Sequence, residues 1–199
     1  MRRSAKLSIQ TVLLFSLMTG YIYLSGQNVI TLDAGNLGKA WQEYVANPGS
    51  ETAGKVYALL PDGVMNLEIK LQVEVREQIN QGINALESQI VAGDQDSLKL
   101  AFRLFTIADP PLIESLAVTL GNFMQFNTRS FLQELKNHKH LVPDISIILC
   151  SFQRTLIDDK PGQELEKKIR QKALDGNEDE DLKEIKKECL KALKKCEIK

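Results

Sequence analysis

Apolar side chains recur every three or four residues along most of this chain, which is the spacing of one face of an α-helix. The most apolar internal stretch, Leu98–Phe126, is interrupted at its centre by Asp109-Pro110-Pro111. Proline cannot continue a helix, because it lacks the backbone N–H, but it suits the first position of a new one. The pattern therefore predicts two antiparallel helices, one ending near Ala108 and one running from Pro110 to about Phe126, with Asp109 as the cap between them.

The same spacing, between stops made of Pro, Gly, Asn and Asp, predicts further helices along the chain. They cover Leu37–Ala46, Glu51–Leu60 with Ser50 as the N-cap, 78–92, Asn127–His138, Leu141–Leu156 starting at Val142-Pro143-Asp144, Pro161–Ala173 and Asn177–Cys196. Leu67–Val75 alternates strictly between apolar and polar residues, which is typical of a strand, but no other segment alternates in this way and could pair with it. We therefore interpret it as the start of the helix that continues from Gln78.

These elements predict an all-α fold of antiparallel helix pairs, either α-solenoid-like or an irregular helical array, in a single helical domain over residues 31–199. The stretch from Asp94 to about Phe152, with its proline corners, resembles HEAT- or armadillo-like repeats. The resemblance covers less than a third of the chain and includes no recurring motif of matching residues. It implies helix pairs and a concave surface for a partner, and it implies no catalytic residue.

Residues 1–30 differ from the rest of the chain. Arg2, Arg3 and Lys6 precede an apolar run over Leu7–Gly26, which is typical of a secretory signal. The run is also about as long as a membrane-spanning helix, roughly 20 residues. We expect an exported protein, periplasmic or otherwise in the cell envelope, with either a cleaved signal peptide or an N-terminal membrane anchor. Contact with the membrane is expected only through residues 7–26, if they stay uncleaved.

The charge balance excludes one class of partner. The whole chain carries 25 basic and 26 acidic residues, and without the three cations of residues 1–30 the remainder carries 22 and 26. A nucleic-acid-binding protein needs a basic patch or stripe, so we expect no nucleic-acid partner. The mixed charges of residues 165–196 favour an amphipathic helix pair that covers one end of the helical array, and the alternative is a coiled segment that binds a partner.

The three cysteines leave the redox state open. Cys189 and Cys196 are seven residues apart on one predicted helix, about 10 Å, which is too far for a disulfide. Any disulfide therefore pairs Cys150 with Cys189 or Cys196. Export permits such a bond, but buried thiols acting as small apolar side chains are the interpretation we favour.

Candidate chemistry is sparse. His138 and His140 lack neighbours with ligand spacing, so we expect a solvated helix end rather than a metal site. The acidic segment Asp175–Glu184 invites comparison with a calcium loop, but counting from Asp175 the sixth place is Glu180 and the twelfth is Lys186, where such a loop needs Gly and Glu. No nucleophile elbow or phosphate-binding loop occurs. The sequence thus indicates no catalytic, cofactor-binding or metal-binding residue.

These observations predict an exported, non-catalytic binding or scaffold protein that holds a protein or peptide partner in a groove between its helix pairs. The alternative is an envelope hydrolase that acts through carboxylates, with Glu114 as one candidate. Geometry separates the two hypotheses. An enzyme needs a deep pocket with converging polar groups and a perturbed pKa, whereas a binding module needs a partly apolar groove wider than a small molecule requires.

Overall fold

Every regular element in the described part of the chain is helical, which confirms the predicted all-α class. The computed structural model describes residues 33–63, 72–153 and 158–198. The elements are α2 (Ala34–Ala46), α3 (Ser50–Leu59), α4 (Gln72–Val91), α5 (Gln95–Leu104), α6 (Pro110–Phe126), α7 (Thr128–His138), η2 (Lys139–Leu141), α8 (Ile145–Leu149), α9 (Lys160–Asp175), η4 (Glu180–Leu182) and α10 (Lys183–Lys194).

Short polar side chains start most of these helices. The carboxylate of Asp109 accepts a hydrogen bond from the backbone N–H of Leu112 at 3.1 Å, and Pro110 and Pro111 occupy the first turn of α6, as predicted. Asp33, Asp94, Asn127, Asp144 and Asp159 cap their helices in the same way. Each cap satisfies an N–H group that has no partner inside its own helix, so these residues fix where the chain turns.

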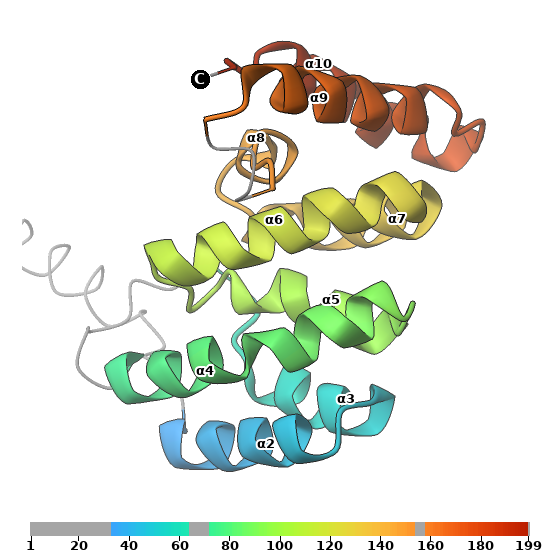
Figure 1. The fold of residues 1–199 in the computed structure, drawn as a ribbon. Helices are drawn as coiled ribbons and strands as arrows, with labels where there is room; N and C mark the ends of the chain where they lie inside the picture. Colours follow the sequence, from blue (N-terminus) through green and yellow to red (C-terminus); the bar gives the residue numbers. More distant parts are fainter. Residues whose placement is uncertain (1–32, 64–71, 154–157, 199) are drawn as a thin grey trace, which may run out of the picture. The chain divides into compact units, whose positions relative to one another are not determined.

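The helices of Leu32–Lys199 stack in two rows, which we call the first and the second ladder, and contacts between consecutive helices join the two rows (Figure 1). In the first ladder α2 packs on α4, α4 on α6 and α6 on α9, and in the second α3 packs on α5, α5 on α7 and α7 on α10. Consecutive helices connect the two ladders: α2 contacts α3, α4 contacts α5, α6 contacts α7 and α9 contacts α10. The short helix α8 contacts α6 and α10. One continuous apolar core lies between the ladders.

The first ladder contains one very close approach between helices. A Cβ atom on Gly82 of α4 would lie 2.4 Å from Cγ2 of Val45 and 2.7 Å from Nε1 of Trp41. The indole N–H of Trp41 instead donates to the carbonyl of Gln78 at 3.0 Å. Gly82 therefore lets α2 pack directly against the backbone of α4.

Several predicted boundaries need correction. The helix expected to reach Ala108 ends at Leu104. After it, the hydroxyl and the backbone N–H of Thr106 both donate hydrogen bonds to the carbonyl of Arg103, which forms a turn instead of a further turn of α-helix. Ser50 is the first residue of α3 rather than its cap, and its hydroxyl bonds to the Asp94 carboxylate instead. The predicted helix through Leu67–Val75 is confirmed from Gln72 onward, while residues 67–71 lie outside the described residues.

Candidate functional site

A large groove lies between α6, α8, α9 and α10. Its volume is about 1140 Å³, and small-molecule sites usually occupy roughly 300–1,000 Å³. It is lined by Glu114, Val118, Lys139, Val142–Ser146, Cys150–Gln153, Asp158, Gln163, Glu188, Lys191, Ala192 and Lys195–Glu197. Of these only Val142, Gln163 and Cys196 are buried. The α8 groove, as we name this cavity, is therefore open to solvent and larger than a typical small ligand needs.

The lining of the α8 groove is mixed. Apolar side chains come from α6 and from the segment around α8, and they include Val118, Ile145 and Phe152. Charged side chains of both signs, five acidic and three basic, lie among them. Lys139 pairs with Glu188 of α10, so one cation and one anion of the lining neutralise each other within the protein.

The carboxylate of Asp144 is held in its charged form. It accepts a hydrogen bond from the backbone N–H of Ser146 at 2.8 Å at the start of α8. This bond, the Ser146 hydroxyl and the nearby charge of Lys195 lower the pKa of Asp144. Asp144 and Lys195 thus line the groove from two different elements.

A disulfide joins the two elements that carry Asp144 and Lys195. Cys150 and Cys196 are bonded, with their Cα atoms 5.3 Å apart, and both line the α8 groove. Our preference for buried thiols was wrong for this pair, because α8 and the end of α10 lie in contact although 46 residues separate the two cysteines. It is correct for Cys189, which is buried and free. Burial raises the pKa of its thiol to about 12, so it is unreactive.

Behind the α8 groove, Arg170 of α9 holds the end of α8. Its side chain is fully buried and donates to the carbonyls of Ile148 and Leu149 at 3.1 and 2.9 Å, and to that of Ser151 at 2.8 Å. The guanidinium lies 5.2 Å from the centre of the Phe152 ring. These carbonyls would otherwise be unpaired at a helix end, so Arg170 replaces the next turn of α8. This explains why the helix predicted to reach Leu156 ends at Leu149.

Glu166 completes this network one turn before Arg170. Its carboxylate is almost fully buried and pairs with the guanidinium. It also accepts hydrogen bonds from the side-chain amide of Gln125 on α6 and the backbone N–H of Gln153, both at 3.2 Å. Burial lowers the pKa of Arg170, and the adjacent Glu166 carboxylate opposes that shift. The ion pair thus joins α6, α9 and the segment after α8.

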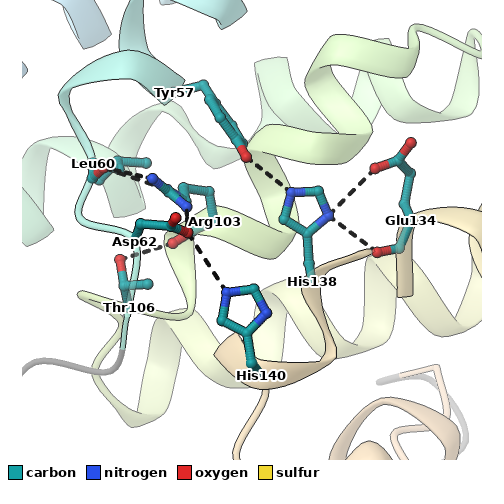
Figure 2. A network of polar contacts seen from close by, with 8 residues as sticks. All are labelled: Tyr57, Leu60, Asp62, Arg103, Thr106, Glu134, His138 and His140. Atoms are coloured by element: carbon teal, nitrogen blue, oxygen red, sulfur yellow. Dashed lines mark hydrogen bonds and ion pairs between the residues drawn. The ribbon is translucent and has the colours of Figure 1, made fainter. Parts of the chain in front are cut away.

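A second polar network lies between α3, α5 and α7 (Figure 2). Arg103 of α5 donates to the carbonyl of Leu60, at 3.3 Å from Nε and 3.2 Å from Nη2, and it pairs with Asp62. Its guanidinium lies 4.9 Å from the centre of the Tyr57 ring. The hydrogen bond from Arg103 is the main cause that lowers the pKa of Asp62. His140 lies 3.5 Å from the same carboxylate.

His138 is buried in this network, which corrects the prediction of a solvated helix end. Its Nδ1 lies 3.0 Å from the backbone oxygen and 3.3 Å from the carboxylate of Glu134, so Nδ1 carries a proton. Its Nε2 is hydrogen-bonded to the Tyr57 hydroxyl at 3.0 Å. The ring stacks on Phe102 of α5, which places the end of α7 inside the core rather than in water.

The Tyr57–His138–Glu134 chain has the connectivity of a proton relay, in which an acid orients a histidine that can accept a proton from a hydroxyl. A relay acts on a substrate only if a cavity reaches the hydroxyl. Tyr57 lines neither the α8 groove nor either of the two smaller cavities described by the structure. We assign this network to the stability of the fold, because its hydrogen bonds and ring contacts join three helices of the second ladder.

No known protein family, curated protein or solved structure matches this chain.

The other residues that the sequence singled out are placed as follows. Glu114 lies in α6 and lines the α8 groove. Within the described ranges no group of three or more His, Cys, Asp or Glu residues could hold a metal ion. Residues 1–30, with the predicted signal, lie outside the described residues.

Within the same ranges, no helix is both long enough and apolar enough to cross a bilayer.

The sequence did not reveal the two buried arginines, Arg103 and Arg170. Each lies in a helix that contains at least one other basic residue, so no pattern marks it as the buried one. The one available signal was at Arg170, which shares a helical face with Gln163 and Glu166, while Leu165 and Ile169 lie on another face.

Proposed function

We propose that this protein is an exported, non-catalytic binding or scaffold protein that holds a segment of a protein or peptide in the α8 groove. The observation that carries the proposal is the groove itself. It is larger than a small ligand needs, opens to solvent and combines apolar side chains with charges of both signs. A segment of polypeptide uses these features, because its apolar side chains are buried while its polar backbone keeps partners at the edge.

The arrangement of helices supports the same proposal. Two ladders of packed helices are also the arrangement of HEAT- and armadillo-like repeats, which bind other proteins along extended surfaces. The basic start and apolar run of residues 1–30 support export. The disulfide between Cys150 and Cys196 suits the oxidising compartment that export implies.

A photoreactive amino acid placed on α10 tests the α8 groove directly. Position 191 lines the groove, and position 187, one turn earlier on α10, is also exposed but does not line it. Irradiation of intact cells should yield a defined adduct with one protein from position 191, and none from position 187. Val118→Arg, which places a long cation in the groove, should remove the adduct. Equal labelling from both positions, or adducts that survive Val118→Arg, would overturn the proposal.

One observation favours the alternative, an envelope hydrolase that acts through carboxylates. Glu114 lines the α8 groove together with Asp144, Asp158, Glu188 and Glu197. A glycosidase needs one carboxyl group with a raised pKa as its general acid, whereas the pKa of Asp144 is lowered. Release of soluble products from envelope glycan by the purified protein, lost at least a hundredfold in Glu114→Gln, would establish the alternative. Absence of turnover, together with a stoichiometric adduct at position 191, would exclude it.

A further inference from the structure

The disulfide between Cys150 and Cys196 can be reached from the α8 groove. Both cysteines line this open cavity, but they are not equally exposed. Cys150 is partly exposed, whereas only 6% of the surface of Cys196 is accessible to solvent. A disulfide opens when a thiolate attacks one of its two sulfur atoms, so the rate depends on access to that atom. A thiol that enters the groove therefore reaches Cys150 in preference to Cys196.

Hydrogen bonds hold Cys150 in place independently of the disulfide. Its backbone N–H donates to the carbonyl of Ser146 at 2.8 Å at the end of α8. The carbonyls on either side of it, those of Leu149 and Ser151, accept hydrogen bonds from the buried guanidinium of Arg170 at 2.9 and 2.8 Å. The segment that carries Cys150 is thus bound to α9 whether the disulfide is closed or open.

The other end of the disulfide is held by the same helix. The backbone N–H of Cys196 donates to the carbonyl of Leu193 at 3.2 Å, just after α10. Its carbonyl accepts a hydrogen bond from Nζ of Lys167 on α9 at 2.7 Å. Helix α9 therefore binds the segments of both cysteines, whose Cα atoms lie 5.3 Å apart. When the bond opens, the two thiols stay close to each other, which favours its closure.

We propose that Cys150 is a thiol-exchange site, at which a thiol in the α8 groove opens the disulfide and becomes covalently bound to the protein. The incoming thiol loses its proton to water, and its sulfur forms a bond to Sγ of Cys150. The bond to Cys196 breaks in the same step, and the released thiolate of Cys196 takes a proton from water. One disulfide replaces another, so no further oxidant or reductant is needed. Attack by Cys196 on the mixed disulfide reverses the step.

The reacting group is a thiol, which a small molecule or a cysteine of a polypeptide can supply. Glutathione serves as the small probe, and a peptide with one cysteine among apolar residues serves as the other. The faster of the two identifies the source, because a peptide can also contact apolar side chains of the groove such as Val118 and Ile145. Exchange with glutathione requires only access to Cys150, so it is independent of whether the groove binds a protein partner.

Mapping of the attacked sulfur in the oxidised, full-length protein tests the proposal. The protein reacts briefly with reduced glutathione, a maleimide then alkylates the free thiols, and mass spectrometry of unreduced peptides locates both groups. Glutathione should be at least tenfold more abundant on Cys150 than on Cys196, with the maleimide on Cys196. The third cysteine, Cys189, adds little background, because it is buried and burial raises the pKa of its thiol to about 12. Glutathione on both cysteines equally, or mainly on Cys196, would overturn the proposal.

Two matched variants, which lack the same disulfide, give an independent measurement. Cys196→Ser leaves Cys150 as a free thiol, and Cys150→Ser leaves Cys196 as one. Oxidised glutathione should modify Cys196→Ser at least tenfold faster than Cys150→Ser, and removal of free glutathione should reverse the adduct of the wild type but not that of Cys196→Ser. Circular dichroism of the reduced wild type should keep its helical signal, because α9 still binds both segments. Equal rates in the two variants, a wild-type adduct that persists, or loss of the helical signal on reduction would each contradict the proposal.

Discussion

Arg103 on α5 and Arg170 on α9 hold the ends of two helices with the same set of contacts. At the end of α3, Arg103 donates to one backbone carbonyl, that of Leu60, and at the end of α8, Arg170 donates to those of Ile148 and Leu149. Each also lies over an aromatic ring, and each pairs with a carboxylate. In both places the guanidinium supplies the donors that another turn of helix would have supplied, so the chain can leave the helix without unpaired carbonyls.

The two sites differ in where the carboxylate lies. The side chain of Asp62, the partner of Arg103, is 72% exposed, whereas that of Glu166, the partner of Arg170, is 6% exposed. Water can replace Arg103 as a partner for Asp62, but water does not reach Glu166. Similar contacts therefore have different energetic consequences, because removal of the arginine leaves a buried carboxylate without its cation in only one of the two sites.

Replacement of each arginine by alanine gives the largest expected effect. Arg170→Ala leaves a buried carboxylate and three carbonyls without their donor, and we expect a loss of about 3–5 kcal/mol in the free energy of unfolding. Arg103→Ala leaves mainly the Leu60 carbonyl unpaired, and we expect about 1–3 kcal/mol. Urea denaturation followed by circular dichroism measures both. Equal losses, or a larger loss at Arg103, would contradict the role that we assign to burial of the carboxylate.

Besides Arg170, a disulfide between Cys150 and Cys196 holds the segment after α8, and the Arg103 site has no such covalent link. Loss of the bond in Cys196→Ser frees a loop spanning 46 residues in sequence, and we expect a cost of roughly 2–4 kcal/mol. Because the disulfide and Arg170 hold the same few residues, their effects should not add. Urea denaturation of Arg170→Ala, Cys196→Ser and the double variant measures the coupling. Strict additivity would show that the two ties act on independent parts of the fold.

The contrast between α10 and α9 shows how far the sequence could predict the structure. The buried face of α10 is apolar and consists of Ile185, Cys189 and Leu193, because apolar burial alone decides its orientation. In α9 the buried pair of Glu166 and Arg170 decides the orientation instead. Capping residues and prolines act locally, which is why the corner at Asp109 could be predicted to the residue.

The candidate site could not be predicted in the same way. The α8 groove depends on contacts between residues far apart in the chain, such as Cys150 with Cys196 and Arg170 with Leu149. A single sequence does not show which distant segments meet. The burial of His138 has the same origin, since it depends on Tyr57 of α3, 81 residues away. Glu114 could be named in advance as a carboxylate, but nothing in its local sequence indicated that it would line a groove.

A substitution at a glycine next to Arg170 tests the packing of the guanidinium without changing any charge. A Cβ atom on Gly121 of α6 would lie 2.7 Å from Nη1 and 2.9 Å from Cζ of Arg170. Gly121→Ala should displace the buried guanidinium and cost about 1–3 kcal/mol. Gly54→Ala in α3 is the matched control, because no atom lies within 4 Å of the new methyl group. The control should gain about 0.5–1 kcal/mol from helix propensity. If thermal denaturation shows that both variants gain stability, Arg170 is not held rigidly against α6.

The smallest expected effect is the pH dependence at the exposed Arg103 site. The hydrogen bond from Arg103 lowers the pKa of Asp62 below its ordinary value of 3.8. The folded protein therefore holds this carboxylate in its charged form more strongly than the unfolded chain does. The contribution of Asp62 to stability is complete above the unfolded pKa, and it is lost as the pH falls through the folded pKa. Asp62→Asn removes this contribution at every pH.

Melting temperatures of the wild type and Asp62→Asn should consequently differ slightly and by a constant amount above about pH 5. The difference should narrow as the pH falls below 3.8, where the carboxyl group becomes neutral in the wild type as well. In an Arg103→Ala background, Asp62→Asn should have little effect at any pH, because the donor that lowers the pKa is absent. A difference between wild type and variant that persists unchanged to pH 2, or that grows on acidification, would show that Asp62 does not act through its ion pair with Arg103.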